Sequence, residues 1–215
     1  LKIYGDFSTP REPGLELPIW DFLALIGVAW FGDGFRDDPL WSLLAELAGR
    51  EHDTMPGDSV PVPDAWRVPP HWLDAFPEPG IWRRQIAQGR LRVRHPAGFL
   101  LLDLPADAEL SEALSGYDVP RSLEHAPDMQ VEIGDGWMGW MGRFLPYLEA
   151  RLARALDRED VRDICRVPAR VRRSDTHLDV YMRLDDIDLD VRQAGLDRNP
   201  GWVPSAGRFI HFHFD

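Results

Sequence analysis

Seven prolines fall within residues 51–80, and this density restricts the fold more than any other feature of the sequence. Proline has no backbone N–H and clashes with the preceding turn of a helix, so neither a long helix nor a central strand can cross such a stretch. We expect an extended connector with one short turn near Trp72. The connector either separates two subdomains or wraps around the core, using Trp66 and Trp72 as apolar anchors.

Two helices are predicted before this connector. Residues 16–32 are apolar nearly all round, which is typical of a buried helix, and Pro18 and Gly32 suit its first turn and its end. Residues 37–50 form a second helix, in which Asp38 can cap the N-terminus. The N-terminal part of the chain is therefore expected to be helical.

A longer helix is predicted over residues 136–156, because large apolar side chains recur there at helical spacing and only Pro146 interrupts the pattern. Its first turns carry Trp137 and Trp140. These two residues belong to the core of the helix packing or, alternatively, contact a partner protein. Trp202 has the same two interpretations. It follows a turn, and we expect it to be buried against the last strands. If it lies on the surface instead, it is an anchor for a partner protein.

The rest of the chain predicts β-structure. Residues 91–105 form a hairpin around His95-Pro96-Ala97-Gly98, and residues 169–184 and 208–214 alternate as an antiparallel meander. Residues 185–191 alternate acidic and apolar side chains, which predicts another strand with a solvated acidic face. The expected fold class is α+β, with N-terminal and central helices packed with a small C-terminal antiparallel sheet.

These predicted elements divide the chain into three parts. They are a helical part over residues 1–50, a segment with the proline-rich connector, hairpin and acidic loop over 51–135, and the long helix with the meander over 136–215. We expect them to form one compact unit, which could be a fragment of a longer chain.

The formal net charge of −12 disfavours nucleic acids and anionic membrane surfaces as partners. Residues 105–135 hold eight of the acidic side chains and one base, which predicts an exposed acidic loop or a docking surface for a basic protein. Cys165 is the single cysteine, so no internal disulfide can form, and a cytoplasmic location is expected. No apolar run is long enough to span a membrane.

The terminal strand carries the residues that most resemble a chemical site. Alternation places His211, His213 and Asp215 on one face, and His177 lies on the polar face of another predicted strand. Two histidines and a carboxylate match the ligand types of zinc and non-haem iron sites. An ordinary strand with histidines on its exposed face explains the same pattern, and we favour it.

Gly134, Gly136 and Gly139 fit the spacing of a dinucleotide-binding loop before a helix. The preceding residues 130–133 alternate and carry an acid, whereas a central parallel strand is continuously apolar. We therefore expect no nucleotide and no other cofactor. The glycines are better explained as residues that let the start of the tryptophan-rich helix pack closely.

Three segments, DPLWSLLAELAGR, PYLEARLARAL and AGLDRNPGWVPSAGRFIHFHF, together resemble an uncharacterised family of bacterial proteins encoded near phage-tail-like contractile injection systems. They cover less than a quarter of the chain. The last is the most specific, through Gly195, Leu196, Asp197, Pro200, Gly201, Trp202, Pro204, Gly207 and Phe212. The resemblance implies a role in an assembly and carries no catalytic pattern.

The sequence therefore favours a non-enzymatic structural or protein-interaction component whose partners are other proteins. The resemblance implies that it is an accessory of a contractile injection assembly. The alternative is a metal-binding module or metal-dependent enzyme that uses the histidine-rich terminal strand. Whether the chain is an enzyme stays open, with a non-enzymatic role favoured because none of the common catalytic motifs occurs.

Overall fold

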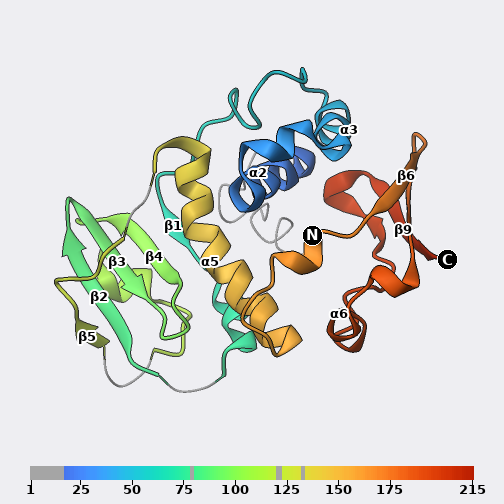
Figure 1. Cartoon of the computed structure of the whole chain (residues 1–215). Helices are drawn as coiled ribbons and strands as arrows, with labels where there is room; N and C mark the ends of the chain where they lie inside the picture. The colour runs from blue at the N-terminus through green and yellow to red at the C-terminus, as the bar shows by residue number, and fades with distance from the viewer. Residues whose placement is uncertain (1–16, 78–79, 120–122, 132–133) are drawn as a thin grey trace. The chain divides into compact units, whose positions relative to one another are not determined.

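The computed structural model describes residues 17–77, 80–119, 123–131 and 134–215 (Figure 1). By their internal contacts the described residues form two compact units, which lie within Leu1–Val60 with Leu152–Asp215 and within Pro61–Arg151. Helices and two mixed sheets confirm the predicted α+β class. The division of the sequence into three stretches stays a prediction.

The first unit begins with the two predicted helices, α2 (Ile19–Phe31) and α3 (Pro39–Ala48), joined by the 3-10 turn η1 (Asp33–Asp37). As expected, Asp38 caps α3, since its Oδ1 accepts a hydrogen bond of 2.8 Å from the Leu40 N–H. A buried ion pair joins α2 to the end of α3 over 2.8 Å between Arg50 Nε and Asp21 Oδ1. These contacts hold the helical pair together.

The C-terminal sheet of this unit has four strands in the order β6-β7-β9-β8. Their bounds are Ala169–Arg173 for β6, His177–Met182 for β7, Gly201–Val203 for β8 and Arg208–Phe214 for β9. Strand β7 pairs with β9 in parallel, while the other two pairings are antiparallel. The sheet is therefore mixed, and the expected purely antiparallel meander is wrong.

The segment between β7 and β8 explains the parallel pairing. Residues 185–191, predicted as a strand, instead lie in the 3-10 turn η4 (Leu184–Asp186) and the short helix α6 (Leu189–Gln193). Parallel strands need a crossover connection, and this helical excursion supplies one. Arg158 Nη1 lies 2.8 Å from Asp188 Oδ2, so the acids of this stretch bind an arginine rather than line a strand.

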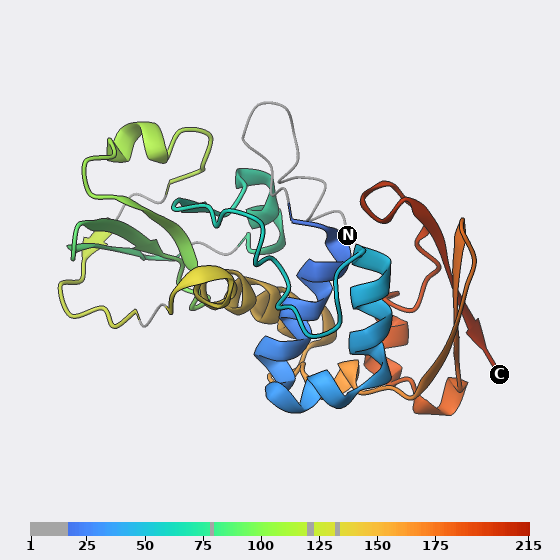
Figure 2. The ribbon, with the colours of Figure 1, turned by 90° about the horizontal axis from the view of Figure 1, so that it is seen from above.

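One face of this sheet turns toward the helices, as Figure 2 shows, and it carries the buried side chains Leu178, Ile210 and Val203. Two contacts tie the sheet region to the helices. Arg173 pairs with Glu46 of α3, and the Arg166 guanidinium lies 5.0 Å from the centre of the Phe31 ring. The opposite face of the sheet carries the exposed side chains described below.

The second unit is built on a five-stranded sheet in the order β1-β4-β3-β2-β5. The bounds are Trp66–Arg67 for β1, Trp82–Ala87 for β2, Arg90–Arg94 for β3, Leu100–Pro105 for β4 and Leu123–His125 for β5. The antiparallel pair β3–β4 confirms the predicted hairpin. The sequence did not predict the additional strands β1, β2 and β5.

The long helix α5 (Gly136–Leu156) forms as predicted and packs against this sheet with aromatic side chains. The Trp66 and Trp140 rings meet edge to face at 5.2 Å, and Trp66 Nε1 donates a hydrogen bond of 2.8 Å to the Leu100 carbonyl. Trp72, in the 3-10 turn η2 (Pro70–Ala75), stacks on Tyr147 at 5.1 Å. Both connector tryptophans are buried, so the connector wraps the core of this unit.

The opposite face of the sheet is covered by the short helix α4 (Leu110–Ala113) and the residues that follow it (Figure 1). The Tyr117 ring meets the Trp82 ring of β2 edge to face at 6.1 Å, and its hydroxyl donates to the Val68 carbonyl. Arg67 of β1 donates a hydrogen bond of 2.7 Å to the carbonyl of Ala113. This second face of the sheet is thus partly covered within its own unit, and Ile86 of β2 stays exposed on it.

Candidate functional site

The exposed face of the C-terminal sheet carries a row of aromatic side chains that crosses three strands. Because β7 and β9 are parallel and in register, His177 lies opposite Phe209 and Tyr181 lies opposite His213. Trp202 of β8 lies opposite Phe209 from the other side. We call this row the aromatic face; its members are Trp202, Phe209, His177, His211, His213 and Tyr181.

The rings of the aromatic face touch one another in sequence. The ring centroids of Trp202 and Phe209 lie 5.2 Å apart, those of Phe209 and His177 5.1 Å, and those of His177 and His211 5.7 Å. His213 stacks on Tyr181 at 4.6 Å. Trp202 is 49% exposed and Phe209 39%, so both rings leave apolar area open to solvent. Contacts with the neighbouring rings hold them in place.

Two arginines of the edge strand β6 extend this surface. The guanidiniums of Arg170 and Arg172 lie 5.0 and 5.3 Å from the centre of the Tyr181 ring, within the range of cation–π attraction. Within the described part of the chain neither has a carboxylate partner, whereas the neighbouring Arg173 pairs with Glu46. The end of the aromatic face at β6 is therefore cationic.

An acid, Asp179, lies in the middle of this face, opposite His211. The Nε2 of His213 lies 2.8 Å from its Oδ1, and the Nδ1 of His211 lies 3.8 Å from the same oxygen. The hydrogen bond from His213, followed by the charges of the neighbouring histidines, lowers the pKa of Asp179 below its ordinary value. The carboxylate is thus a hydrogen-bond acceptor that orients the His213 ring.

The predicted metal ligands are brought together only in part. His177, His211 and His213 share one face, as the alternation predicted, but Asp215 is exposed at the end of the chain, where its backbone N–H bonds to the Met182 carbonyl. Among the residues that the structure describes, no group of three or more His, Cys, Asp or Glu side chains could hold a metal ion. A metal site at this strand stays a prediction.

The three tryptophans considered as partner contacts are placed differently. Trp137 and Trp140 are 7% and 1% exposed, so both pack inside the second unit and present no surface to a partner. Trp202 was expected to be buried, and this expectation is wrong. Strand β8 is a three-residue edge strand, and its alternation turns Val203 inward and Trp202 outward.

A second candidate lies in the other unit, where Asp103 is completely buried among arginines. Its Oδ1 accepts hydrogen bonds from Arg90 Nε at 2.9 Å and from Arg92 Nε at 3.4 Å, and its Oδ2 accepts from Arg143 Nε at 2.8 Å. Arg90 also reaches Asp64. Burial alone would lower the pKa of Arg90, but its bonds to Asp103 and Asp64 raise it, so the group stays charged.

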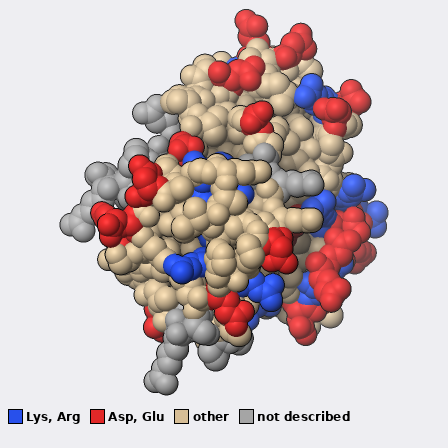
Figure 3. Space-filling model, turned by 90° about the vertical axis from the view of Figure 1, so that its left-hand side faces the viewer, with Lys and Arg blue, Asp and Glu red and all other residues tan. Residues whose placement is uncertain are grey.

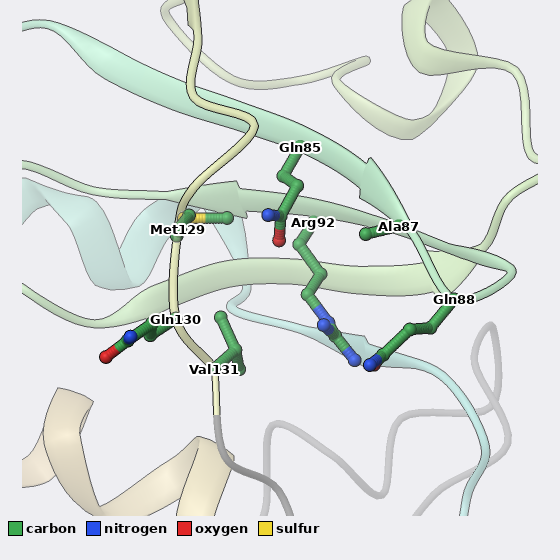
Figure 4. A pocket seen from close by; sticks show the side chains of 7 residues that line it. All are labelled: Gln85, Ala87, Gln88, Arg92, Met129, Gln130 and Val131. Atoms are coloured by element: carbon green, nitrogen blue, oxygen red, sulfur yellow. The ribbon is translucent and has the colours of Figure 1, made fainter.

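A cavity of about 280 Å³ opens beside this network, between the β2–β3 hairpin and residues 126–131, which we call the strap (Figure 4). The strap is tied to the sheet by its carbonyls. Gln85 Nε2 donates to the Pro127 carbonyl at 2.7 Å, and Arg94 donates to the Gln130 carbonyl at 3.0 Å. The lining consists of Gln85, Ala87, Gln88, Arg92, Met129, Gln130 and Val131. Sequence reasoning missed this site, because its two walls, the β2–β3 hairpin and the strap, lie far apart in the sequence.

The acidic residues within 105–135 are largely exposed, as predicted. Figure 3 shows acidic side chains in several separate groups on the face that it presents, with Lys and Arg side chains between some of them. That face therefore offers no single continuous acidic surface. The docking of a basic protein on this loop stays a prediction.

The glycines of the nucleotide-like pattern have a packing role. A Cβ on Gly139 would lie 1.7 Å from the Gly134 carbonyl oxygen, so this first turn of α5 approaches the preceding loop too closely for any side chain. Gly136 has a φ of 62°, which favours glycine. The predicted alternating segment before them includes Glu132 and Ile133, which lie outside the described residues.

Comparison with known proteins gives no relative for this chain. No family model matches it, and neither the curated proteins nor the solved structures contain a significant match. No helix in the described part of the chain has both the length and the apolar character needed to cross a membrane. The candidate sites must therefore be interpreted from their own chemistry.

Proposed function

We propose that this protein is a non-enzymatic interaction component that binds an acidic segment of another protein on its aromatic face. The proposal rests on one observation: the exposed rings of Trp202 and Phe209 pack together at one end of the aromatic face, and at its other end two arginines without carboxylate partners among the described residues lie near the Tyr181 ring. Tryptophan, tyrosine and arginine are the residues that contribute most binding energy at protein interfaces. The rings are already fixed by one another, so little conformational entropy is lost on binding.

The charge of the surface supports an acidic partner. Arg170 and Arg172 stand at one end of the face, and Asp179 is occupied by His213. A carboxylate of a partner would form hydrogen-bonded ion pairs with these arginines. A neutral or basic segment would leave them unpaired. Stacked aromatics with arginine also suit single-stranded nucleic acid, but the net charge of −12 opposes a polyanion.

The resemblance to proteins encoded near contractile injection systems gives this proposal its setting. Sheath, tube or baseplate proteins are the partners that we propose, and the cytoplasm is the proposed location. An accessory protein of this kind needs a docking surface and no catalytic centre. The metal-dependent alternative is less favoured, because among the described residues no group of three or more His, Cys, Asp or Glu side chains could hold a metal ion.

Capture of partners from the native host, with quantitative mass spectrometry, tests the proposal. The full chain is compared with a Trp202→Ser/Phe209→Ser variant, an Arg170→Glu/Arg172→Glu variant and a matched control, Leu189→Ser, which alters another exposed apolar residue of the same unit. We expect one set of particle proteins to bind the full chain and the control and to be lost from both face variants.

The partner's chemistry is then tested with acidic peptides from the captured protein and with single-stranded RNA and DNA. Binding of the peptides that weakens with salt supports an acidic protein partner. Capture that is unchanged in both face variants would refute the aromatic face as the docking surface. Nucleic acid that binds through the same residues more tightly than the peptides would replace the protein partner.

A further inference from the structure

We propose that the cavity under the strap binds a small carboxylate that carries its own hydrogen-bond donor, of which a 2-hydroxy acid is the simplest example. Nothing in the proposed docking function requires this site, since it belongs to the other unit. The inference rests on two buried polar side chains that face the cavity with unused hydrogen-bonding capacity.

Arg92 supplies the attraction for an anion. The residue is 8% exposed and lines the cavity, yet in the described part of the chain its guanidinium makes one hydrogen bond, the long Nε contact to Asp103 at 3.4 Å. Figure 4 shows its side chain crossing the cavity toward Gln88. The two terminal nitrogens are therefore available, and a planar carboxylate matches their fork geometry.

Gln85 adds the requirement for a donor. Its Nε2 is fixed by the Pro127 carbonyl at 2.7 Å, which settles the orientation of the amide. Its Oε1 is buried and has no hydrogen-bond partner among the described residues. A buried acceptor without a donor costs about 1–3 kcal/mol, so a ligand hydroxyl or N–H placed there removes that cost.

The local charge and the walls of the cavity agree with such a ligand. Among the described residues, the guanidiniums of Arg90, Arg92 and Arg143 share the Asp103 carboxylate, and Asp64 is a second partner of Arg90, so positive charges outnumber negative ones in this network beside the cavity. Asp128 of the strap is exposed and does not line it.

The cavity also has apolar walls that can contact the carbon chain of the ligand. Ala87, Met129 and Val131 give it apolar walls. A volume of about 280 Å³ is at the small end of ligand sites, which fits a molecule with a short carbon chain. Inorganic phosphate has the acceptors and a donor, but it would leave these walls without contacts.

Ligand-observed NMR titrations of the full chain test the proposal with matched pairs of acids: glycolate against acetate and L-lactate against propionate, with inorganic phosphate as a further probe. We expect each hydroxy acid to bind at least about tenfold more tightly than its partner, the effect of one satisfied hydrogen bond. Equal affinity within both pairs, or no binding of any acid, would overturn the proposal. Phosphate that binds most tightly would overturn the carboxylate assignment.

Three variants locate the site. Gln85→Met should remove the difference between glycolate and acetate. Ala87→Leu should fill the cavity and weaken lactate at least about tenfold without touching the polar network. Ile86→Ala is the control, because Ile86 is the exposed neighbour on the opposite face of the strand. Circular dichroism checks that each variant folds, and unchanged lactate binding in Ala87→Leu would place the ligand elsewhere.

Discussion

Substitution of Asp103 by asparagine should lower the stability of the second unit more than the loss of any other single charge within it. The carboxylate is 0% exposed and receives Nε–H groups from Arg90, Arg92 and Arg143, whose side chains are only 10–15% exposed. Asparagine keeps the shape, but it removes the negative charge and turns an NH₂ group toward arginine donors. Three partly buried guanidiniums then lose their shared counter-ion.

Removal of one partner from a buried ion pair costs about 3–5 kcal/mol, because the remaining charge stays desolvated. We expect a loss in this range for Asp103→Asn. The matched control is Asp64→Asn, which also removes a carboxylate from Arg90 but from a side chain that is 74% exposed. Exposed pairs contribute about 0–1 kcal/mol, so the control should change stability little.

Hydrogen exchange measured by mass spectrometry on peptides that cover β3 and β4 separates this unit from the rest of the chain. A loss of 3 kcal/mol corresponds to exchange faster by about a hundredfold or more. Added salt should change the result little, because a buried pair is poorly screened. A difference below about 1 kcal/mol between the two variants would refute the argument, since Asp103 would then contribute no more than a surface carboxylate.

Two further predictions concern single positions in the first unit. Asp157→Gly should raise the free energy of unfolding by about 1 kcal/mol in a urea titration. Asp157 directly follows α5 with a φ of 51°, which favours glycine, and it places a negative charge at the helix C-terminus. A loss of stability would show that its side chain makes a needed contact. Protein purified without a histidine tag should carry no stoichiometric zinc or iron, and chelation should leave its thermal stability unchanged; about one metal per chain, lost in His211→Ala, would promote the metal-binding alternative.

The sequence predicted well those elements whose signals are local. Helices α2 and α3 and the hairpin β3–β4 are bounded by caps and turns, such as Asp38 at the start of α3, and these signals act over a few neighbouring residues. The alternation of the last strand placed His211 and His213 on one face correctly. Such patterns predict the faces of a strand correctly, because the geometry of the backbone alone determines which side chains share a face.

The errors arose where long-range contacts decide the structure. Residues 185–191 alternate like a strand, yet they form η4 and α6, and two of their acids lie near Arg158, which is distant in the sequence. Trp202 has the apolar area of a core residue, but an edge strand gives it no neighbour on its outer side. Nothing in the local pattern contains this information.

The arginines of β3 show why the cavity could not be predicted. In RLRVR, Arg90, Arg92 and Arg94 occupy equivalent positions on one face of the strand. Among the described residues, Arg90 pairs with Asp103 and Asp64, Arg94 donates to a strap carbonyl, and Arg92 makes one long contact, to Asp103. The difference depends on which residue β2, β4 or the strap brings opposite each arginine. A ligand-binding role for Arg92 therefore follows from what its neighbours leave unpaired, which the alternation of the strand cannot show.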